Sequence, residues 1–127
     1  MKYTSSYILP RVSDKPLVWL GSSLADLRAF PEDARRIAGF QLRRVQQQLE
    51  PTDYKWVPSV GAGVHEIRVH TGAEHRVFYV ARFAEAVYVL HAFEKRTRRT
   101  SRQDLDLARK RYGDLMERRR REQHAKG

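Results

Sequence analysis

The sequence predicts an α+β domain: a small antiparallel sheet, with an N-terminal αα-hairpin and a C-terminal helix packed on one face of the sheet. Three observations support this fold class. Apolar residues recur at helical spacing up to Pro51, runs of β-branched and aromatic residues separated by short turns follow, and helical spacing returns after Thr100. With 127 residues, 41% of them apolar, the chain can form one core but not two domains.

The first part of the chain predicts one strand and two helices. Residues 1–14 form a polar leader, and the short apolar run at 15–20 has the size of a strand. A helix capped by one of two consecutive serines follows. Pro31 then takes the favoured first position of a second helix, whose apolar stripe continues until Pro51. These two helices form the predicted hairpin.

Three central runs predict an antiparallel meander because the turns that join them are short. They are residues 64–70, 75–83 and 87–93. The residues before them, 54–57, are either a loop or a short edge strand. A last helix, capped by Thr100 or Ser101, runs to about Arg118 and carries its apolar side chains on one side.

Positive charge is concentrated near the C-terminus. The chain has 25 basic and 15 acidic residues, and residues 94–127 alone hold 13 of the basic and 6 of the acidic ones. A one-sided positive field attracts polyanions, of which nucleic acid is the usual one in the cytoplasm. For residues 117–122 taken alone we favour a solvated basic segment. We therefore place the folded domain at residues 15–116 and a basic tail at 117–127.

Composition excludes several classes of function. The chain has no cysteine, which rules out a disulfide scaffold, a thiolate nucleophile and cysteine-ligated metal sites. No apolar run is long enough to span a membrane and no signal peptide is indicated, so we expect a cytoplasmic protein with no membrane partner. Three histidines, His65, His70 and His75, lack metal-ligand spacing, and neither a metal nor a cofactor is expected.

The meander brings the ends of three strands together at one edge of the sheet. The side chains expected there are Arg68, Arg76, His91 and Lys95. Strand register decides which of them share a face, so the pattern predicts proximity only. Further cations carry the charge from this edge to the start of the last helix: Arg96, Arg98, Arg99 and Arg102. A phosphate would meet hydrogen-bond donors and a helix dipole there.

Each candidate also has a purely structural interpretation. The sheet arginines could pair with neighbouring glutamates, which is the favoured interpretation for either one alone. His91 lies in an apolar run, where a buried histidine bonded to the backbone is the commoner outcome. Tyr54 and Trp56 are either core or stacking surfaces for bases, of which core is favoured, and Lys55 between them could be solvated.

Five segments of the chain together carry a family resemblance. They are WLGSSLADL at 19–27, FPED at 30–33, GVHEIR at 63–68, RVFY at 76–79 and VYVLHAFEKRT at 87–97. In this order they resemble the phage Gp49-like branch of the RelE/HigB toxin superfamily, over about residues 17–116. The resemblance implies a RelE-like fold and a type II toxin that cleaves messenger RNA on the ribosome. It also implies a helix-turn-helix antitoxin, with operator DNA bound only through the antitoxin complex.

The resemblance implies roles for single residues. Arg68 and Arg76 resemble the family's sheet arginines, and Lys95 with Arg96 resembles its basic pair after the last strand. The sequence departs from the family pattern at two positions. The tyrosine that RelE carries beyond the basic pair has no counterpart, and His75 replaces a tyrosine of many Gp49-like sequences.

Metal-free RNA cleavage needs a base for the 2′-hydroxyl, cations for the phosphate and an acid for the 5′-oxygen. Crowded cations depress a lysine pKa, which favours Lys95 or Lys55 as the base, and His91 is an acid or base candidate. We expect further RNA contacts from Lys55, Arg98, Arg99 and Arg102. The alternative is a catalytically inactive relative that binds RNA, or binds an antitoxin in transcriptional autoregulation.

Overall fold

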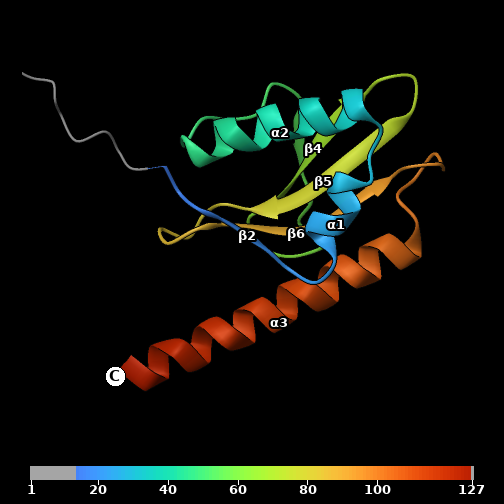
Figure 1. Cartoon of the computed structure of the whole chain (residues 1–127). Coiled ribbons are helices and arrows are strands. Elements are labelled where there is room, and N and C mark those ends of the chain that lie inside the picture. The colour runs from blue at the N-terminus through green and yellow to red at the C-terminus, as the bar shows by residue number, and fades with distance from the viewer. Residues whose placement is uncertain (1–13, 127) are drawn as a thin grey trace, which may run out of the picture.

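A computed structural model describes residues 14–126 as a five-stranded mixed sheet with helices on both of its faces (Figure 1). The strand order across the sheet is β2-β6-β5-β4-β3. The strands are β2 (Leu17–Trp19), β3 (Tyr54–Trp56), β4 (Val64–His70), β5 (Glu74–Val80) and β6 (Val87–Glu94). The helices are α1 (Ser23–Arg28), α2 (Glu32–Gln46) and α3 (Arg102–Lys126).

The α+β class and the central meander are confirmed, but the sheet is not purely antiparallel. Strands β3 to β6 pair antiparallel with their neighbours, while β2 lies parallel to β6, with Leu17 opposite Val87. A parallel pair needs a long crossover, and here α1, α2 and three strands separate the partners. The first strand is short and carries no signal for its partner's direction, so this pairing was not visible in the sequence.

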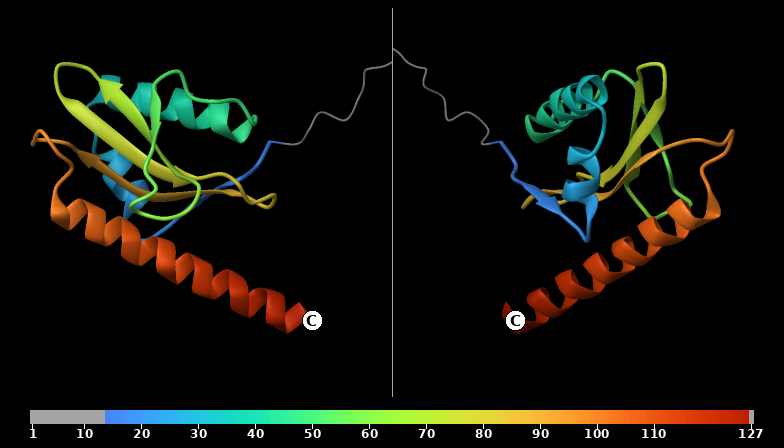
Figure 2. Two further views of the ribbon diagram at one scale, coloured as in Figure 1. Left: turned by 180° about the vertical axis from the view of Figure 1, so that it is seen from behind. Right: turned by 45° about the vertical axis from the view of Figure 1, so that its right-hand side comes forward.

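The prediction that all helices pack on one face is wrong. Helices α1 and α2 cover one face of the sheet and α3 covers the other, as Figures 1 and 2 show. The physical reason is that residues 77–80 of β5 and 87–90 of β6 are successive apolar or aromatic residues, so both faces of these central strands must be buried. Val77 and Tyr79 face α2, whereas Phe78 and Val80 belong to the core under α3.

Helix α2 follows the predicted pattern closely. It begins directly after Pro31, and Ala34, Ala38 and Leu42 place one buried stripe on the sheet. The helix ends at Gln46, earlier than the predicted limit of Pro51, because Gln48 adopts a positive φ of 65° that no longer continues the helix. The chain then reaches β3, which resolves the loop-or-strand alternative for residues 54–57 as a short edge strand.

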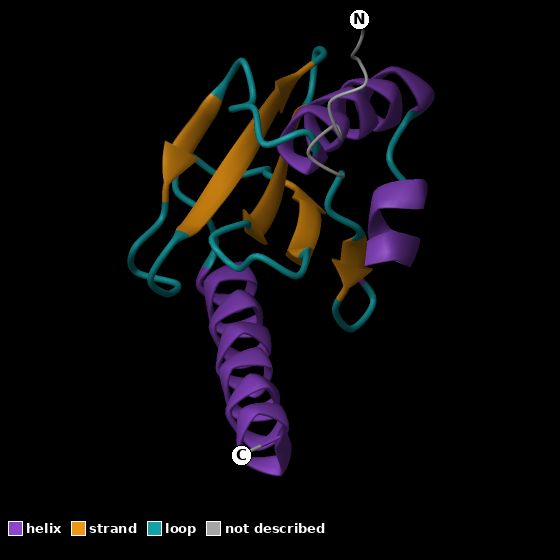
Figure 3. Ribbon diagram, turned by 90° about the vertical axis from the view of Figure 1, so that its left-hand side faces the viewer, coloured by secondary structure: helices purple, strands orange, loops and turns teal. Residues whose placement is uncertain are grey.

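Helix α3 is longer than predicted. Ser101 caps its start: Asp104 donates its backbone N–H to Ser101 Oγ at 3.1 Å, and Ser101 Oγ donates to the Asp104 carboxylate at 2.7 Å. It continues past Arg118 to Lys126, so the basic segment predicted as a tail is helical. Its last turns extend beyond the sheet (Figure 3). The predicted leader lies outside the described residues except for Asp14.

The middle of α3 is fixed to the loop between β5 and β6. Arg119 donates from Nε to Glu85 Oε2 at 2.7 Å, and its guanidinium lies 3.6 Å above the Phe83 ring centroid. The hydrogen bond from Arg119 lowers the pKa of Glu85 to about 2.

Among residues 14–126, no helix combines the length and apolarity needed to cross a membrane.

Leu42→Ala and Leu115→Ala test whether both faces of the sheet are cores. Each leucine is 2% exposed, one under α2 and one under α3, so each substitution should lower the free energy of unfolding by about 2–5 kcal/mol. Chemical denaturation measures this loss. The control Phe40→Ala removes a side chain that is 59% exposed and should change stability by less than about 0.5 kcal/mol. A Leu115 variant as mild as this control would contradict the second core.

Glu85→Gln tests the contact that fixes α3. The folded pKa of Glu85 lies below the unfolded value of 4.5, so the contact stabilises the protein above about pH 4.5 and is lost as pH falls toward 2. Because both side chains contact solvent, we expect a loss of only about 1 kcal/mol at pH 7. Denaturation at several pH values should show the variant and the parent converging near pH 2. Asp114→Asn, which removes an exposed pair with Lys110, serves as the control. A difference that persists unchanged at pH 2 would contradict the ion pair.

Candidate nucleic-acid interface

The two sheet arginines occupy one face of the sheet. Arg68 on β4 lies directly opposite Arg76 on β5, and Arg76 lies opposite Phe93 on β6. Directly paired residues point to the same side, and Phe93 belongs to the core under α3. Both arginines therefore lie on the α3 side of the sheet. The predicted proximity of these two arginines is confirmed, and the strand register shows that they share the α3 face of the sheet.

Lys95 lies at the same end of the sheet. Its backbone N–H donates to Glu74 O at 2.7 Å, which continues the pairing of β6 with the start of β5. Its ammonium Nζ donates to Arg98 O at 2.6 Å, so the side chain closes the loop that leads to α3. We call the three residues Arg68, Arg76 and Lys95 the basic cluster.

Carboxylates share this face with the basic cluster. Arg76 Nη1 lies 3.0 Å from Glu74 Oε1, and its Nε lies 3.9 Å from Glu66 Oε1. Arg68 Nε lies 3.7 Å from Asp53 Oδ1. The Arg76 side chain is 6% exposed, whereas that of Arg68 is 38% exposed. Arg76 therefore serves mainly to neutralise two acids, the buried Glu66 and the partly exposed Glu74, and Arg68 keeps the larger surface for a ligand.

His70 completes this polar face, and the sequence analysis did not include it in the site. Its Nδ1 lies 2.7 Å from Glu74 Oε1 and its Nε2 lies 2.8 Å from Asp53 Oδ2. The hydrogen bond with Glu74, assisted by Asp53, raises the pKa of His70, and the same hydrogen bond lowers the pKa of Glu74. The sequence did contain a signal that His70 belongs to this face. Side chains alternate along a strand, and His70 follows Arg68 by two residues, so both point to the same face of the sheet.

His91 reaches the α3 side through an irregularity in β6. The register between β5 and β6 shifts after Phe78, and Leu90 and His91 both lie on the side of α3. His91 is 5% exposed, and its Nε2 lies 2.7 Å from Asp104 Oδ1 at the start of α3. Its ring stacks on Phe93 with centroids 4.7 Å apart. This histidine ties the sheet to the helix and has little surface for a substrate.

The remaining predicted cations form an exposed rim around the basic cluster: Lys55, Arg96, Arg98, Arg99 and Arg102. Arg96 Nη2 lies 3.0 Å from Glu94 Oε1, and its side chain is 79% exposed. Lys55 stands on the edge strand opposite Glu66. Surface ion pairs of this kind hold their partners weakly, so these cations remain available to a polyanion.

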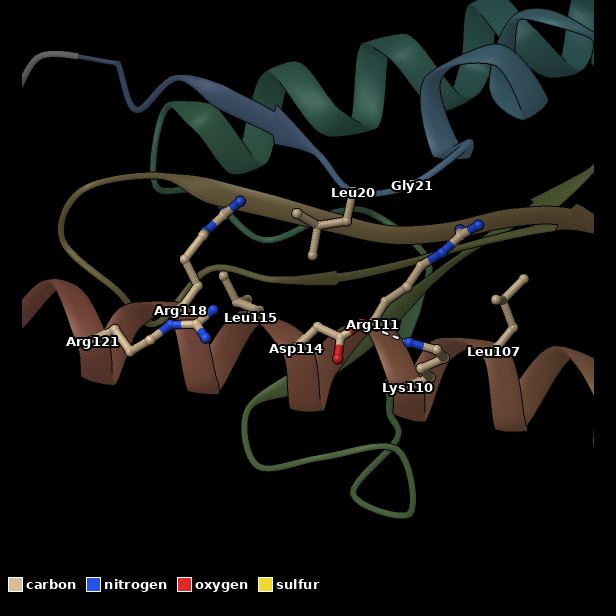
Figure 4. A pocket seen from close by; sticks show the side chains of 9 residues that line it. All are labelled: Leu20, Gly21, Leu107, Lys110, Arg111, Asp114, Leu115, Arg118 and Arg121. Atoms are coloured by element: carbon tan, nitrogen blue, oxygen red, sulfur yellow. Dashed lines mark hydrogen bonds and ion pairs between the residues drawn. The ribbon is translucent and has the colours of Figure 1, made fainter.

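A second basic surface lies along α3, where the sequence predicted only a solvated face. A groove of about 420 Å³ runs between the helix and Leu20–Gly21 (Figure 4). Lys110, Arg118 and Arg121 line it together with Asp114. Arg111 also lines it and is structural, since it donates to Leu90 O at 2.9 Å and to Ser22 Oγ at 3.0 Å. Helical spacing brings these cations to one side of α3.

The three histidines considered for metal binding lie apart. His65 and His75 face α2, while His70 lies on the opposite side of the sheet. In the part of the chain that the structure describes, no three His, Asp or Glu side chains are arranged to hold a metal ion.

Comparison with known proteins identifies the family. Residues 25–113, well over half of the chain, match the model of the family described as phage derived protein Gp49-like (DUF891). The chain belongs to this Gp49-like family. The matched part of this Gp49-like chain contains the whole basic cluster and every cation of the rim. Neither a curated protein nor a solved structure matches the chain.

Arg76→Ala should destabilise the Gp49-like domain strongly. The substitution leaves Glu66 buried without its partner, and breaking a buried pair in this way costs about 3 kcal/mol or more. Arg96→Ala is the matched control, because it removes an exposed pair worth less than about 1 kcal/mol. Thermal and chemical unfolding of the two variants measure the difference. Equal, small losses of stability in both variants would show that Arg76 does not compensate the charge of Glu66 and is available to a ligand.

Proposed function

We propose that this Gp49-like protein is the toxin of a type II toxin–antitoxin system, with a RelE-like fold, and that it cleaves messenger RNA on the ribosome. Family membership supports a toxin-related role. The observation that carries the proposal is the basic cluster, in which Arg68 on β4 and Arg76 on β5 lie at the same end of the sheet as Lys95, the residue directly after β6. Clustered cations stabilise the charge that develops on a phosphate during RNA cleavage.

The reaction needs no cofactor in this proposal. The 2′-oxygen of one nucleotide attacks the adjacent phosphorus, forming a 2′,3′-cyclic phosphate as the bond to the 5′-oxygen breaks. Arg68 clamps the phosphate, and Lys95 or Lys55 removes the 2′-proton. His70 takes the role of the acid that protonates the departing 5′-oxygen, because it is 45% exposed and its neighbours raise its pKa. For this step one of its ring N–H groups must leave its carboxylate, Asp53 or Glu74, and turn to the 5′-oxygen. His91, buried against Asp104, is the weaker candidate for that role.

The proposed RNA partner rests on the charge distribution, and the proposed antitoxin rests on the family resemblance. The exposed rim of arginines attracts ribosome-bound messenger RNA by counterion release. A helix-turn-helix antitoxin covers the basic cluster when the toxin is held inactive, and operator DNA is reached through that complex. We place the protein in the cytoplasm, where both partners occur.

A second candidate function is a relative without nuclease activity that binds RNA or an antitoxin and acts in autoregulation. One observation favours it: Asp53, Glu66 and Glu74 share the face of the basic cluster and repel a phosphate. With Arg76 engaged by two of these acids, fewer cations are left to stabilise a transition state.

Inducible expression followed by mapping of cut messages separates the two functions. The parent should arrest growth and cut transcripts, while Arg68→Ala and Lys95→Ala should lower the cleavage rate by about 100-fold or more. Both side chains are partly exposed, so these variants should fold, which near-parental thermal stability verifies. Arg36→Ala, an exposed arginine of α2, is the matched control. A parent that binds ribosomes yet leaves transcripts whole would overturn the nuclease and support the second candidate.

A further inference from the structure

A groove of about 650 Å³ opens on the α2 side of the sheet, opposite the face of the basic cluster. It lies between the end of α2 and the edge strand β3. Its lining includes Leu49 and Glu50 after α2, Tyr54 and Trp56 on β3, His65 on β4 and Tyr79 on β5. We propose that this groove, which we call the Trp56 groove, binds an unpaired base of single-stranded RNA, with a preference for guanine.

Aromatic rings form the wall of the Trp56 groove. Trp56 is 60% exposed, which shows that the sequence-based preference for a core position was wrong for this residue. Its ring centroid lies 4.0 Å from that of His65, its register partner, and His65 stacks on Tyr79 with centroids 5.5 Å apart. Exposed aromatic rings are the usual platform for unpaired bases, because every base has a flat face that can stack.

The histidine in this wall behaves as a neutral ring. Burial is the main cause that lowers the pKa of His65, so its uncharged form predominates at neutral pH. An uncharged imidazole contributes a flat surface without repelling a cation or attracting a phosphate. The wall therefore recognises the face of a base and not the backbone charge.

Glu50 supplies the group that distinguishes bases. Tyr54 Oη donates to Glu50 Oε2 at 2.5 Å, and Arg44 Nε donates to the backbone oxygen of Glu50 at 2.9 Å, so the residue is held from both sides. A carboxylate accepts two parallel hydrogen bonds from adjacent N–H donors. Guanine presents two adjacent donors on its Watson–Crick edge, N1–H and N2–H, whereas adenine presents only its amino group.

The charge around the Trp56 groove suits a base that is attached to a phosphate chain. Lys15 and Arg82 line the groove, and Lys55 stands exposed on the edge strand between Tyr54 and Trp56. Lys15 Nζ donates to Ala81 O and Phe83 O, and Arg82 Nη2 donates to Tyr112 Oη, so Lys55 is the exposed cation that accompanies the carboxylate of Glu50. Together with the net charge of +10, Lys55 favours an RNA segment over an apolar peptide. Exposed Leu49 adds an apolar surface at the rim, so peptide docking is the competing outcome of the test.

The Trp56 groove and the basic cluster lie on opposite faces of the sheet, and β4 contributes a residue to each. Trp56 pairs with His65 on the α2 side, and Lys55 pairs with Glu66 on the α3 side. An RNA strand that passes the edge of β3 would thus place one base in the groove, contact Lys55 and reach Arg68. This inference takes its RNA ligand from the proposed function, but base binding does not require cleavage.

Binding of short RNA to the full-length protein tests the groove. The probes are hexaribonucleotides of uridine with one central guanosine or adenosine, all carrying 2′-O-methyl groups so that no cleavage is possible. In a Trp19→Phe background, tryptophan fluorescence reports Trp56 alone. We expect saturable quenching of Trp56 and tighter binding of the guanosine probe. The Trp56 variants lack this fluorophore, so their affinities are measured by the fluorescence anisotropy of a dye-labelled probe, to which Trp56→Ala should bind about tenfold more weakly. Trp56→Phe should retain most of the affinity.

Two further variants define the outcomes. Glu50→Gln should bring the affinities for the guanosine and adenosine probes together, because the amide offers one acceptor in place of two. Phe40→Ala removes an equally exposed aromatic ring outside the groove and should bind as the parent does. Parental affinity of Trp56→Ala, or Trp56 fluorescence that no probe changes, would overturn the base site and leave peptide docking. Saturable binding by a protein that cuts no transcripts would support the groove while the nuclease proposal fails.

Discussion

The burial of β5 and β6 on both faces is the constraint from which the rest of the structure follows. Their successive apolar residues require cover on two sides, and only three helices are available among the described residues. Helices α1 and α2 cover one face of the sheet, and α3 covers the other. Because α3 crosses the sheet nearest β6, the α3 side of β3 and β4 stays free for polar groups. Arg68 of the basic cluster lies in this uncovered area, together with His70.

The same division explains how cations and acids coexist at one end of the sheet. Arg76 is buried and compensates Glu66, while Arg68 and Lys95 keep exposed surface. Buried ion pairs are weak contributors to stability but are costly to break. An arginine can therefore belong to a functional site by sequence position and still act mainly by holding its neighbours in place.

Much of the fold could be predicted from local patterns, because helix caps and the change from helical to alternating spacing depend on neighbouring residues. Pro31 and Ser101 marked helix starts, and the meander followed from its short turns. The direction of β2 and the side taken by α3 depend on contacts between distant segments, which spacing does not encode. Within the site, proximity was predictable, but the shift that turns His91 toward Asp104 was not. The sequence analysis wrongly favoured a core position for Trp56, because it could not show that α2 packs over β4 and leaves this side of the edge strand β3 open.

The contact of Arg119 with the loop between β5 and β6 divides α3 into two parts with different local stability. Before this residue, Ala108 and Leu115 are buried, and amide exchange there requires opening of the core. After it, residues 120–125 are all exposed, and the helix depends on its own backbone hydrogen bonds. These last turns can unwind and rewind on a short timescale without disturbing the sheet, so a terminal fusion or truncation there would leave the domain intact.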